Sequence, residues 1–413
     1  MKRRAVLYWL LAIFATTLLT RSAWAETVCW PQFRGPGSRS VADAQGLPVH
    51  FDLQTKENVA WIAELPGRGP SGPIVCRGRV FVTCSSGFRQ DRLHLLCFDA
   101  ESGERLWGRR TWATGHTSYH PFGAIACNTP ATDGSRIFAF YSSNDLACFD
   151  LDGNLKWIRG LAYENPSTRN DVGMSSSPVV YGDLVIVQLE NQGESFATGI
   201  DAETGRTVWR IEREKDAAWC SPIILPGETP EQDVLILQSR SSITANDPRT
   251  GRQVWRYETS PHTIASCTTS GANIYLPANG LHRIRFDGAE GRGEVLWGER
   301  RLRGDNASPI VDGDKAYVIK PPGILLCADA ATGDIHWQLR LKGPFWATPV
   351  LADGKWIGVN HKGEVQIVDV TGDEGRLLAE IQIEPGILAS PAIASNAIYF
   401  RGDRYLVKVK QTR

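Results

Sequence analysis

Apolar and polar positions along this chain alternate in the short rhythm that is typical of β-strands. The stretches SPVVYGDLVIVQL (177–189) and SPIVDGDKAYVIK (308–320) each contain an apolar triplet, a glycine turn and a run rich in β-branched residues. Short apolar runs placed around Gly and Asp turns predict β-hairpins. Helical periodicity is almost absent after the first 25 residues, so the pattern predicts an all-β protein.

A second type of hairpin, which ends in tryptophan, recurs along the chain. Its turn contains Asp and Gly, as in GIDAETGRTVW (199–209). We expect Asp201 to accept backbone N–H bonds and Gly205 to adopt the left-handed conformation that closes a short hairpin with a bulge. The tryptophans that end these copies lie 40 to 52 residues apart: Trp107, Trp157, Trp209, Trp255, Trp297 and Trp337.

A period of this length, with two hairpins in each copy, indicates the four-stranded blades of a β-propeller. A four-stranded sheet cannot bury both faces alone, so the blades must stack around an axis, and we expect each tryptophan to wedge between neighbouring sheets. Eight positions mark the starts of the inner strands, and most of them precede a proline: Gly72, Asn128, Ser177, Ser221, Ser266, Ser308, Thr348 and Ser390.

The last copy stops without its outer strand, because the chain ends shortly after YLVKVK (405–410). The missing strand is present at the other end of the domain, in ENVAWIAELP (57–66), which carries Trp61. We therefore predict one eight-bladed β-propeller of four-stranded antiparallel blades, spanning residues 57–410 and closed by an N-terminal strand.

The N-terminal residues have the pattern of an export signal. Three basic residues at positions 2–4 precede the apolar run Ala5–Leu19, and Ala23-Trp24-Ala25 fits a small-x-small cleavage site. The apolar run is shorter than the roughly 20 residues that a spanning helix needs, so we expect no transmembrane segment in the mature chain. The prediction is a signal peptide over 1–25 cleaved after Ala25, an N-terminal extension over 26–56, and a periplasmic or secreted protein.

Charge and cysteine usage narrow the classes of partner. The chain has 45 acidic and 45 basic residues, and removal of the four basic residues of 1–25 leaves a net charge near −4, without a basic stripe for nucleic acid. Cys97, Cys148 and Cys327 occupy the same place in three repeats, so we expect them to be buried thiols on different blades. Another pair of the nine cysteines could be oxidised, and the sequence leaves that pair open. We expect a monomer.

The Ser-Pro-x-x-x-Gly inner strand and the Asp-x-x-Thr-Gly-x-x-x-Trp ending resemble the repeat of the pyrroloquinoline-quinone-like (PQQ-like) propeller family. The resemblance runs from Trp61 to the end of the chain, and WPQFRGPG (30–37) is similar to the opening of exported bacterial members. The family includes quinoprotein alcohol dehydrogenases and the non-catalytic propeller of outer-membrane-protein assembly, which also has eight blades. The resemblance therefore implies the fold, whereas the function has to be argued from the site.

The residues do not favour quinone chemistry. Quinoprotein dehydrogenases are similar to one another in having a disulfide between adjacent cysteines and a bound calcium beside the cofactor. No two cysteines are adjacent in this sequence, and the ends of the inner strands carry no evident set of carboxylate and amide ligands for a hard cation. We expect no cofactor, PQQ included, and no metal site.

The candidate binding residues lie in two long connections between blades, 109–130 and 160–173. Long polar and aromatic loops on a rigid scaffold often carry binding residues. A metal bound by two histidines four positions apart is disfavoured, because Pro121 and Gly123 oppose the helix that such a pair needs. The predicted contact residues are Trp112, His116, Tyr119, His120, Arg169, Asn170 and Asp171.

Trp219 and Trp346 precede two of the inner strands, and they either rim the same channel mouth or pack between blades; we favour packing. With no catalytic motif evident, we predict an exported, non-catalytic propeller that acts as a binding or scaffolding module in the cell envelope, with a protein or another envelope component as its partner. The alternatives are a divergent quinone-dependent oxidoreductase and a sensor that binds a small sugar or phenolic ligand in the channel mouth.

Overall fold

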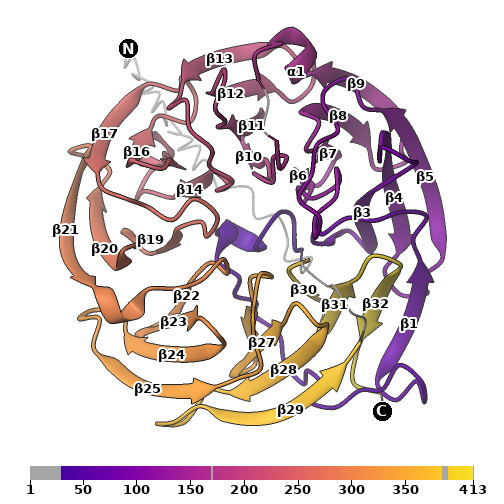
Figure 1. The fold of residues 1–413 in the computed structure, drawn as a ribbon, viewed down its shortest axis with the longest axis vertical. Helices are drawn as coiled ribbons and strands as arrows, with labels where there is room; N and C mark the ends of the chain where they lie inside the picture. Colours follow the sequence, from indigo (N-terminus) through magenta and orange to yellow (C-terminus); the bar gives the residue numbers. More distant parts are fainter. Residues whose placement is uncertain (1–28, 169–170, 384–388, 413) are drawn as a thin grey trace, which may run out of the picture.

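The computed structural model describes residues 29–168, 171–383 and 389–412, and it confirms the eight-bladed all-β architecture. Eight four-stranded sheets surround a central axis, as Figure 1 shows. All strand pairings within these sheets are antiparallel, and each of the first seven sheets follows chain order from the inner to the outer strand. The predicted signal peptide and the first residues of the extension lie outside the described residues.

The blades are numbered here in chain order. Blades 1 to 3 contain β2 (Ile74–Cys76), β3 (Arg79–Ser86), β4 (Arg92–Asp99), β5 (Arg105–Trp112); β6 (Ala131–Thr132), β7 (Arg136–Phe140), β8 (Asp145–Asp150), β9 (Leu155–Gly160); and β10 (Val179–Tyr181), β11 (Leu184–Leu189), β12 (Phe196–Asp201), β13 (Thr207–Glu212). Blades 4 to 6 contain β14 (Ile223–Leu225), β15 (Val234–Gln238), β16 (Ser242–Asn246), β17 (Gln253–Glu258); β18 (Thr268–Ser270), β19 (Asn273–Ala278), β20 (Gly280–Asp287), β21 (Arg292–Glu299); and β22 (Ile310–Asp312), β23 (Lys315–Lys320), β24 (Ile324–Asp329), β25 (Ile335–Arg340). Blades 7 and 8 contain β26 (Val350–Ala352), β27 (Lys355–Val359), β28 (Glu364–Asp369), β29 (Arg376–Gln382); and β30 (Ala392–Ala394), β31 (Ala397–Arg401), β32 (Tyr405–Val409), β1 (Val59–Glu64).

Helical structure in the described residues is limited to four short turns. They connect strands or lie in the N-terminal extension: η1 (Pro36–Ser38), α1 (Leu161–Glu164), η2 (Pro230–Gln232) and η3 (Arg300–Leu302). None of the described helices is long and apolar enough to cross a membrane.

The N-terminal strand closes the ring as predicted. β1 pairs antiparallel with β32, with Trp61 opposite Lys408 and Glu64 opposite Tyr405, and becomes the outer strand of blade 8. Trp61 also contacts blade 1, where its indole Nε1 donates to Ala100 O at 3.2 Å. One strand thus joins the beginning of the domain to both its last and its first blade.

The repeated tryptophans wedge between neighbouring sheets, which confirms their predicted role. Each ring lies against a glycine in the outer hairpin of the next blade, so closely that a Cβ on Gly103 would lie 2.5 Å from the ring of Trp61, and one on Gly205 2.7 Å from that of Trp157. Gly205 has φ +71° and Asp201 accepts the Thr204 N–H at 2.7 Å, as the turn chemistry predicts. The further ring–glycine pairs are Trp107–Gly153, Trp209–Gly251, Trp255–Gly293, Trp297–Gly333 and Trp337–Gly375.

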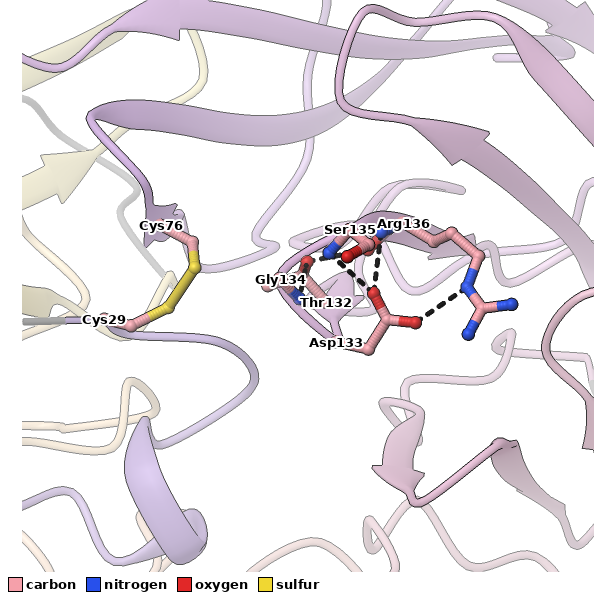
Figure 2. Close-up of a disulfide and its surroundings, with 7 residues drawn as sticks. All are labelled: Cys29, Cys76, Thr132, Asp133, Gly134, Ser135 and Arg136. Carbon is pink, nitrogen blue, oxygen red and sulfur yellow. Dashed lines mark hydrogen bonds and ion pairs between the residues drawn. A yellow bond between two sulfur atoms is a disulfide. The ribbon is translucent and has the colours of Figure 1, made fainter. Parts of the chain in front are cut away.

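A disulfide ties the N-terminal extension to blade 1. Cys29 is bonded to Cys76, the last residue of β2, as Figure 2 shows. The same stretch of the extension reaches blade 2, where the N–H of Thr132 donates to Pro31 O at 2.9 Å. Beside it in Figure 2, Asp133 organises the turn between β6 and β7 by accepting the N–H groups of Ser135 and Arg136 and the Arg136 Nε.

The remaining cysteines are free thiols in the structure. Cys97, Cys148 and Cys327 are fully buried on three different blades, as their equivalent repeat positions predict. Burial raises the pKa of Cys97 and Cys148 to about 12, so these side chains behave as small apolar groups rather than as nucleophiles.

Candidate functional site at the mouth of the channel

A ring of hydroxyl groups surrounds the channel where the inner strands begin. The backbone N–H of one blade donates to the Ser or Thr hydroxyl of the next, as from Thr129 to Ser177 Oγ at 3.0 Å and from Ser177 to Ser221 Oγ at 2.9 Å. The further links are Gly72 to Thr129, Ser221 to Ser266, Ser266 to Ser308, Ser308 to Thr348 and Thr348 to Ser390.

This ring explains a small difference from the predicted strand boundaries. The prediction starts the third inner strand at Ser177, whereas β10 starts at Val179. Proline has no N–H for the ladder, so the Ser-Pro pair stands before the strand, and the serine instead bonds sideways to the next blade. The small residue and proline that open most repeats therefore connect blades to one another around the axis.

The N-terminal extension crosses the centre of the propeller and contacts several inner strands. It bridges β2 through Trp30 and Val75 and β26 through Val41 and Leu351, and η1 contacts the inner strands β14 and β18. Figure 1 shows this indigo segment crossing the centre of the ring. The face of the propeller where the inner strands begin is here called the mouth.

Arg34 holds the extension in the centre of the propeller. Its side chain is 1 % exposed and donates to the backbone oxygens of Cys267, at 2.6 Å, and Pro309, at 3.5 Å, on blades 5 and 6. Burial lowers the pKa of the Arg34 guanidinium to about 10, so the group remains charged at neutral pH. Hydrogen bonds to charged groups are stronger than those between neutral groups, so these contacts fix the segment that precedes η1.

Between the extension and the mouth lies a cavity of about 390 Å³. Phe33 of the extension contributes to its lining, together with members of the hydroxyl ring and residues of the loops that connect blades. The described lining residues include no Asp, Glu, Lys or Arg: Phe33, Pro70, His120, Gly123, Ala124, Cys127, Thr129, Val172, Gly173, Met174, Ser175, Ser177, Trp219, Ser221, Ile264, Ser266, Asn306, Ser308, Trp346, Thr348 and Ser390.

Both Trp219 and Trp346 line this cavity, so the favoured prediction that they merely pack between blades is wrong. Trp219 is fixed by its indole Nε1, which donates to Gly173 O at 2.7 Å, and by its backbone N–H, which donates to Thr263 O at 2.7 Å. Trp346 stacks on His361, with ring centroids 6.0 Å apart and an interplanar angle of 19°.

The connection between β5 and β6 reaches across the mouth to blade 7. The His120 ring lies 5.5 Å from that of Trp346, and the Phe122 ring lies 4.6 Å from that of His361. His120 Nδ1 accepts the N–H of Phe122 at 3.2 Å, while the His120 N–H donates to Val172 O at 3.1 Å. An aromatic cluster of His120, Phe122, Trp346 and His361 therefore borders one side of the cavity.

Those of the other predicted contact residues that the structure describes are not among the residues that line the cavity. Trp112 ends the outer strand β5, is 55 % exposed, and carries the guanidinium of Arg92 over its ring at 5.6 Å. Tyr119 packs against the apolar core between blades 1 and 2, and His116 is exposed and absent from the cavity lining. Asp171 is also exposed and outside the lining, while Arg169 and Asn170 lie outside the described residues.

Several residues of the mouth were not singled out as binding residues from the sequence. Phe33 belongs to WPQFRGPG, which has no periodic pattern that would indicate a role, and Asn306 stands two residues before Ser308. The recurrence of Ser or Thr before proline, which marks the blades, is also a signal for the ring of hydroxyls. No local signal marks Phe122 and His361, because their contact joins loops of blades 2 and 7.

The described residues of the mouth offer few groups that could act in catalysis. No cluster of three or more His, Cys, Asp or Glu side chains that could hold a metal occurs in the described residues. The thiol of Cys127 donates to Met174 O at 2.9 Å, and burial raises its pKa to about 12, so it is not a ready nucleophile. Pyrroloquinoline quinone is a tricarboxylate, and the described lining offers neither cations to pair with it nor carboxylates to hold its calcium, so these residues do not fit that cofactor.

Solved structures with the same architecture include two dehydrogenases and BamB. A europium-containing methanol dehydrogenase superimposes with a TM-score of 0.71 at 13 % identity, over 92 % of this chain and 91 % of that chain. BamB from Moraxella catarrhalis gives 0.61 at 17 % identity, over 85 % and 98 %. Quinohemoprotein alcohol dehydrogenase from Comamonas testosteroni gives 0.69 at 13 % identity, over 95 % and 82 %. At these identities the likeness shows the fold alone.

No curated protein matches the sequence. A family model does, and it covers most of the propeller, including the repeats from which the blades were predicted. The matched segments are residues 37–172, 97–273 and 284–408, and the model describes the outer membrane protein assembly factor BamB. The chain therefore belongs to the BamB-like family of PQQ-like β-propellers.

Proposed function

We propose that this protein is an exported, non-catalytic binding module of the cell envelope, which presents the mouth of its propeller to a partner. The observation that carries the proposal is the cavity at the mouth, which is lined by Phe33 of the extension, by Trp219 and Trp346, and by loops of several blades. Concave, largely apolar sites with a few polar groups are typical binding sites.

The scaffold supports this function by holding the loops in place. The hydroxyl ring joins the inner strands, and the tryptophan–glycine contacts join the outer ones. Loops that are ordered before binding lose little conformational entropy when a partner arrives, so less of the interaction energy is spent on ordering. Rigid display of this kind requires no catalytic group.

The family and the sequence suggest the partner and its place. The family model is that of an assembly factor for outer membrane proteins, which favours a protein or another envelope component as the partner. Export is supported by the pattern of residues 1–25, with a periplasmic or secreted product after cleavage following Ala25. The net charge near −4 after cleavage disfavours nucleic acid, and we propose a monomer without a cofactor.

The alternative is a divergent quinone-dependent oxidoreductase, favoured by the higher TM-scores of the two dehydrogenases. Those scores describe the shared propeller rather than a shared site. The uncharged described lining and the lack of adjacent cysteines argue against this alternative. A small-ligand role for the mouth is compatible with the binding proposal and is developed below.

Site-specific photo-crosslinking in the intact source cell tests the binding proposal. A photo-reactive residue at Ile264, which is 41 % exposed and lines the cavity, should give a discrete crosslinked species. The matched control is Val208, which lies on the outer strand β13. This residue is 53 % exposed and is not among the residues that line the cavity. Crosslinks from both positions alike, or from neither, would contradict a partner at the mouth.

A further inference from the structure

We propose that the mouth cavity binds one neutral pyranose ring, either as a free sugar or as part of a glycan. This inference rests on the proposed binding function and specifies the chemistry of what is bound. It follows from three properties of the cavity. Two of its walls are aromatic, some of its polar groups can still form hydrogen bonds with a ligand, and its described lining contains no charged side chain.

The aromatic walls suit the apolar face of a sugar ring. The indole N–H of Trp219 already donates to Gly173 O, so only the face of its ring is left to contact a ligand. Trp346 is backed by His361 and flanked by His120, which fixes the orientation of its indole. A pyranose carries C–H groups on its faces and hydroxyls on its edge, and rigid aromatic rings bind such apolar faces at small cost in side-chain entropy.

Polar groups without a protein partner line the same cavity. The side-chain amide of Asn306 and the indole N–H of Trp346 make no hydrogen bond with any described residue, and neither belongs to the buried groups that lack a partner. Both therefore remain accessible to a ligand. The amide supplies donors and an acceptor, and the indole supplies a donor, a combination that matches ligand hydroxyls.

The hydroxyl ring adds donors on the inner side of the cavity. Ser308 Oγ accepts the Ser266 N–H at 3.0 Å, and Thr348 Oγ1 accepts the Ser308 N–H at 3.2 Å. Each hydroxyl keeps its own hydrogen, and no described residue accepts it from these two side chains. Enclosing these groups beneath an apolar ligand would leave the donors unsatisfied, which costs free energy.

The combination distinguishes a sugar from the other small molecules of suitable size. A phenolic ring could stack on the indoles but would leave most of the polar groups unpaired. A carboxylated or phosphorylated ligand would bring a charge to a site whose described lining has no opposite charge to compensate for its desolvation. A neutral pyranose satisfies both the walls and the polar groups.

Ligand-observed NMR and calorimetric titration of the mature protein test this inference with glucose, galactose, mannose and N-acetylglucosamine as probes, each up to about 10 mM. At least one should bind saturably, and the corresponding amino sugar or uronic acid, and phenol, should bind at least 10-fold more weakly. Trp346→Ala and Asn306→Ala should each weaken binding about 10-fold or more. Trp112→Ala is the matched control, because Trp112 is exposed and outside the cavity, and should leave binding unchanged.

The inference is overturned if none of the four sugars binds, if phenol or a charged sugar binds as well as the neutral one, or if the two mouth variants bind like the wild type while keeping its thermal stability. A variant that loses thermal stability is replaced by Asn306→Asp, which keeps the size of the side chain, adds a charge and should also weaken binding. Crosslinking at Ile264 without any sugar binding would leave the proposed function standing and remove this inference alone.

Discussion

Gly205, which closes the outer hairpin of blade 3, serves two purposes in this propeller. At Gly205 the backbone adopts φ +71°, which a residue with a side chain rarely does, and the ring of Trp157 occupies the space where a Cβ would stand. The turn chemistry, with Asp201 accepting N–H groups and Gly205 left-handed, could be predicted from the sequence because it is local. The close approach of the tryptophan of the preceding blade was predicted only as a wedge between sheets.

Substitution of this glycine should therefore cost more than backbone strain. We expect Gly205→Ala to lower the free energy of unfolding by about 2–4 kcal/mol, because the methyl group adds a clash with Trp157 to the left-handed strain. Gly182→Ala in the same blade is the matched control: its φ is +54° and nothing lies within 4 Å of its Cβ position, so about 1 kcal/mol is expected. Urea denaturation measures both, and equal losses would show that the indole does not restrict this position.

Among the elements, the N-terminal extension depends most on tertiary contacts. Residues 29–56 contain the short turn η1 and no strand, and they are held by the disulfide at Cys29, by Arg34 in the channel and by bridges to β2 and β26. The sequence left open which cysteines pair, because pairing depends on the path of a segment that has no periodic pattern of its own. The extension nevertheless contributes Phe33 to the lining of the mouth cavity.

The disulfide is expected to anchor this element rather than the propeller. In Cys29→Ser with Cys76→Ser, trypsin should cleave faster after Arg34 and Arg39, while the circular dichroism of the propeller is retained. Loss of the bond, which spans a sequence separation of 47, should lower stability by up to about 4 kcal/mol in the chain-entropy model. Cys127→Ser, which removes a free thiol at the mouth, is the control and should leave cleavage unchanged. Unchanged cleavage in the double variant would contradict the anchoring role.

The whole molecule shows how one architecture can serve different chemistry. The fold is shared with a quinohemoprotein alcohol dehydrogenase and a europium-containing methanol dehydrogenase at TM-scores of 0.69 and 0.71, and the described lining of the mouth carries no charged side chain. Activity in such a ring depends on which side chains the loops bring to the axis, and these differ without any change in the blades.

For the purified mature chain, we therefore expect no quinone-dependent activity. Titration with pyrroloquinoline quinone and calcium should give no saturable change in absorbance, and methanol or ethanol should not reduce a dye in its presence, because the described mouth lacks groups to hold three carboxylates and a hard cation. An apo methanol dehydrogenase treated in the same way provides the positive control. Saturable binding together with dye reduction would favour the oxidoreductase alternative instead.

The sequence by itself determined the blades, their number and the closure of the ring. Turn chemistry, strand alternation and the spacing of tryptophans are local features that repeat, so each copy reports the same hairpins, and the unfinished last copy indicates the strand that completes it.

Only the tertiary structure decided which side chains meet at the mouth. His120 lines the cavity, whereas Trp112, His116, Tyr119 and Asp171 come from the same loops and are not in its lining, because a loop without periodicity can turn its residues to the mouth, the core or the solvent. The contact of His120 and Phe122 with blade 7 depends on closure of the ring, which brings loops distant in sequence to one axis.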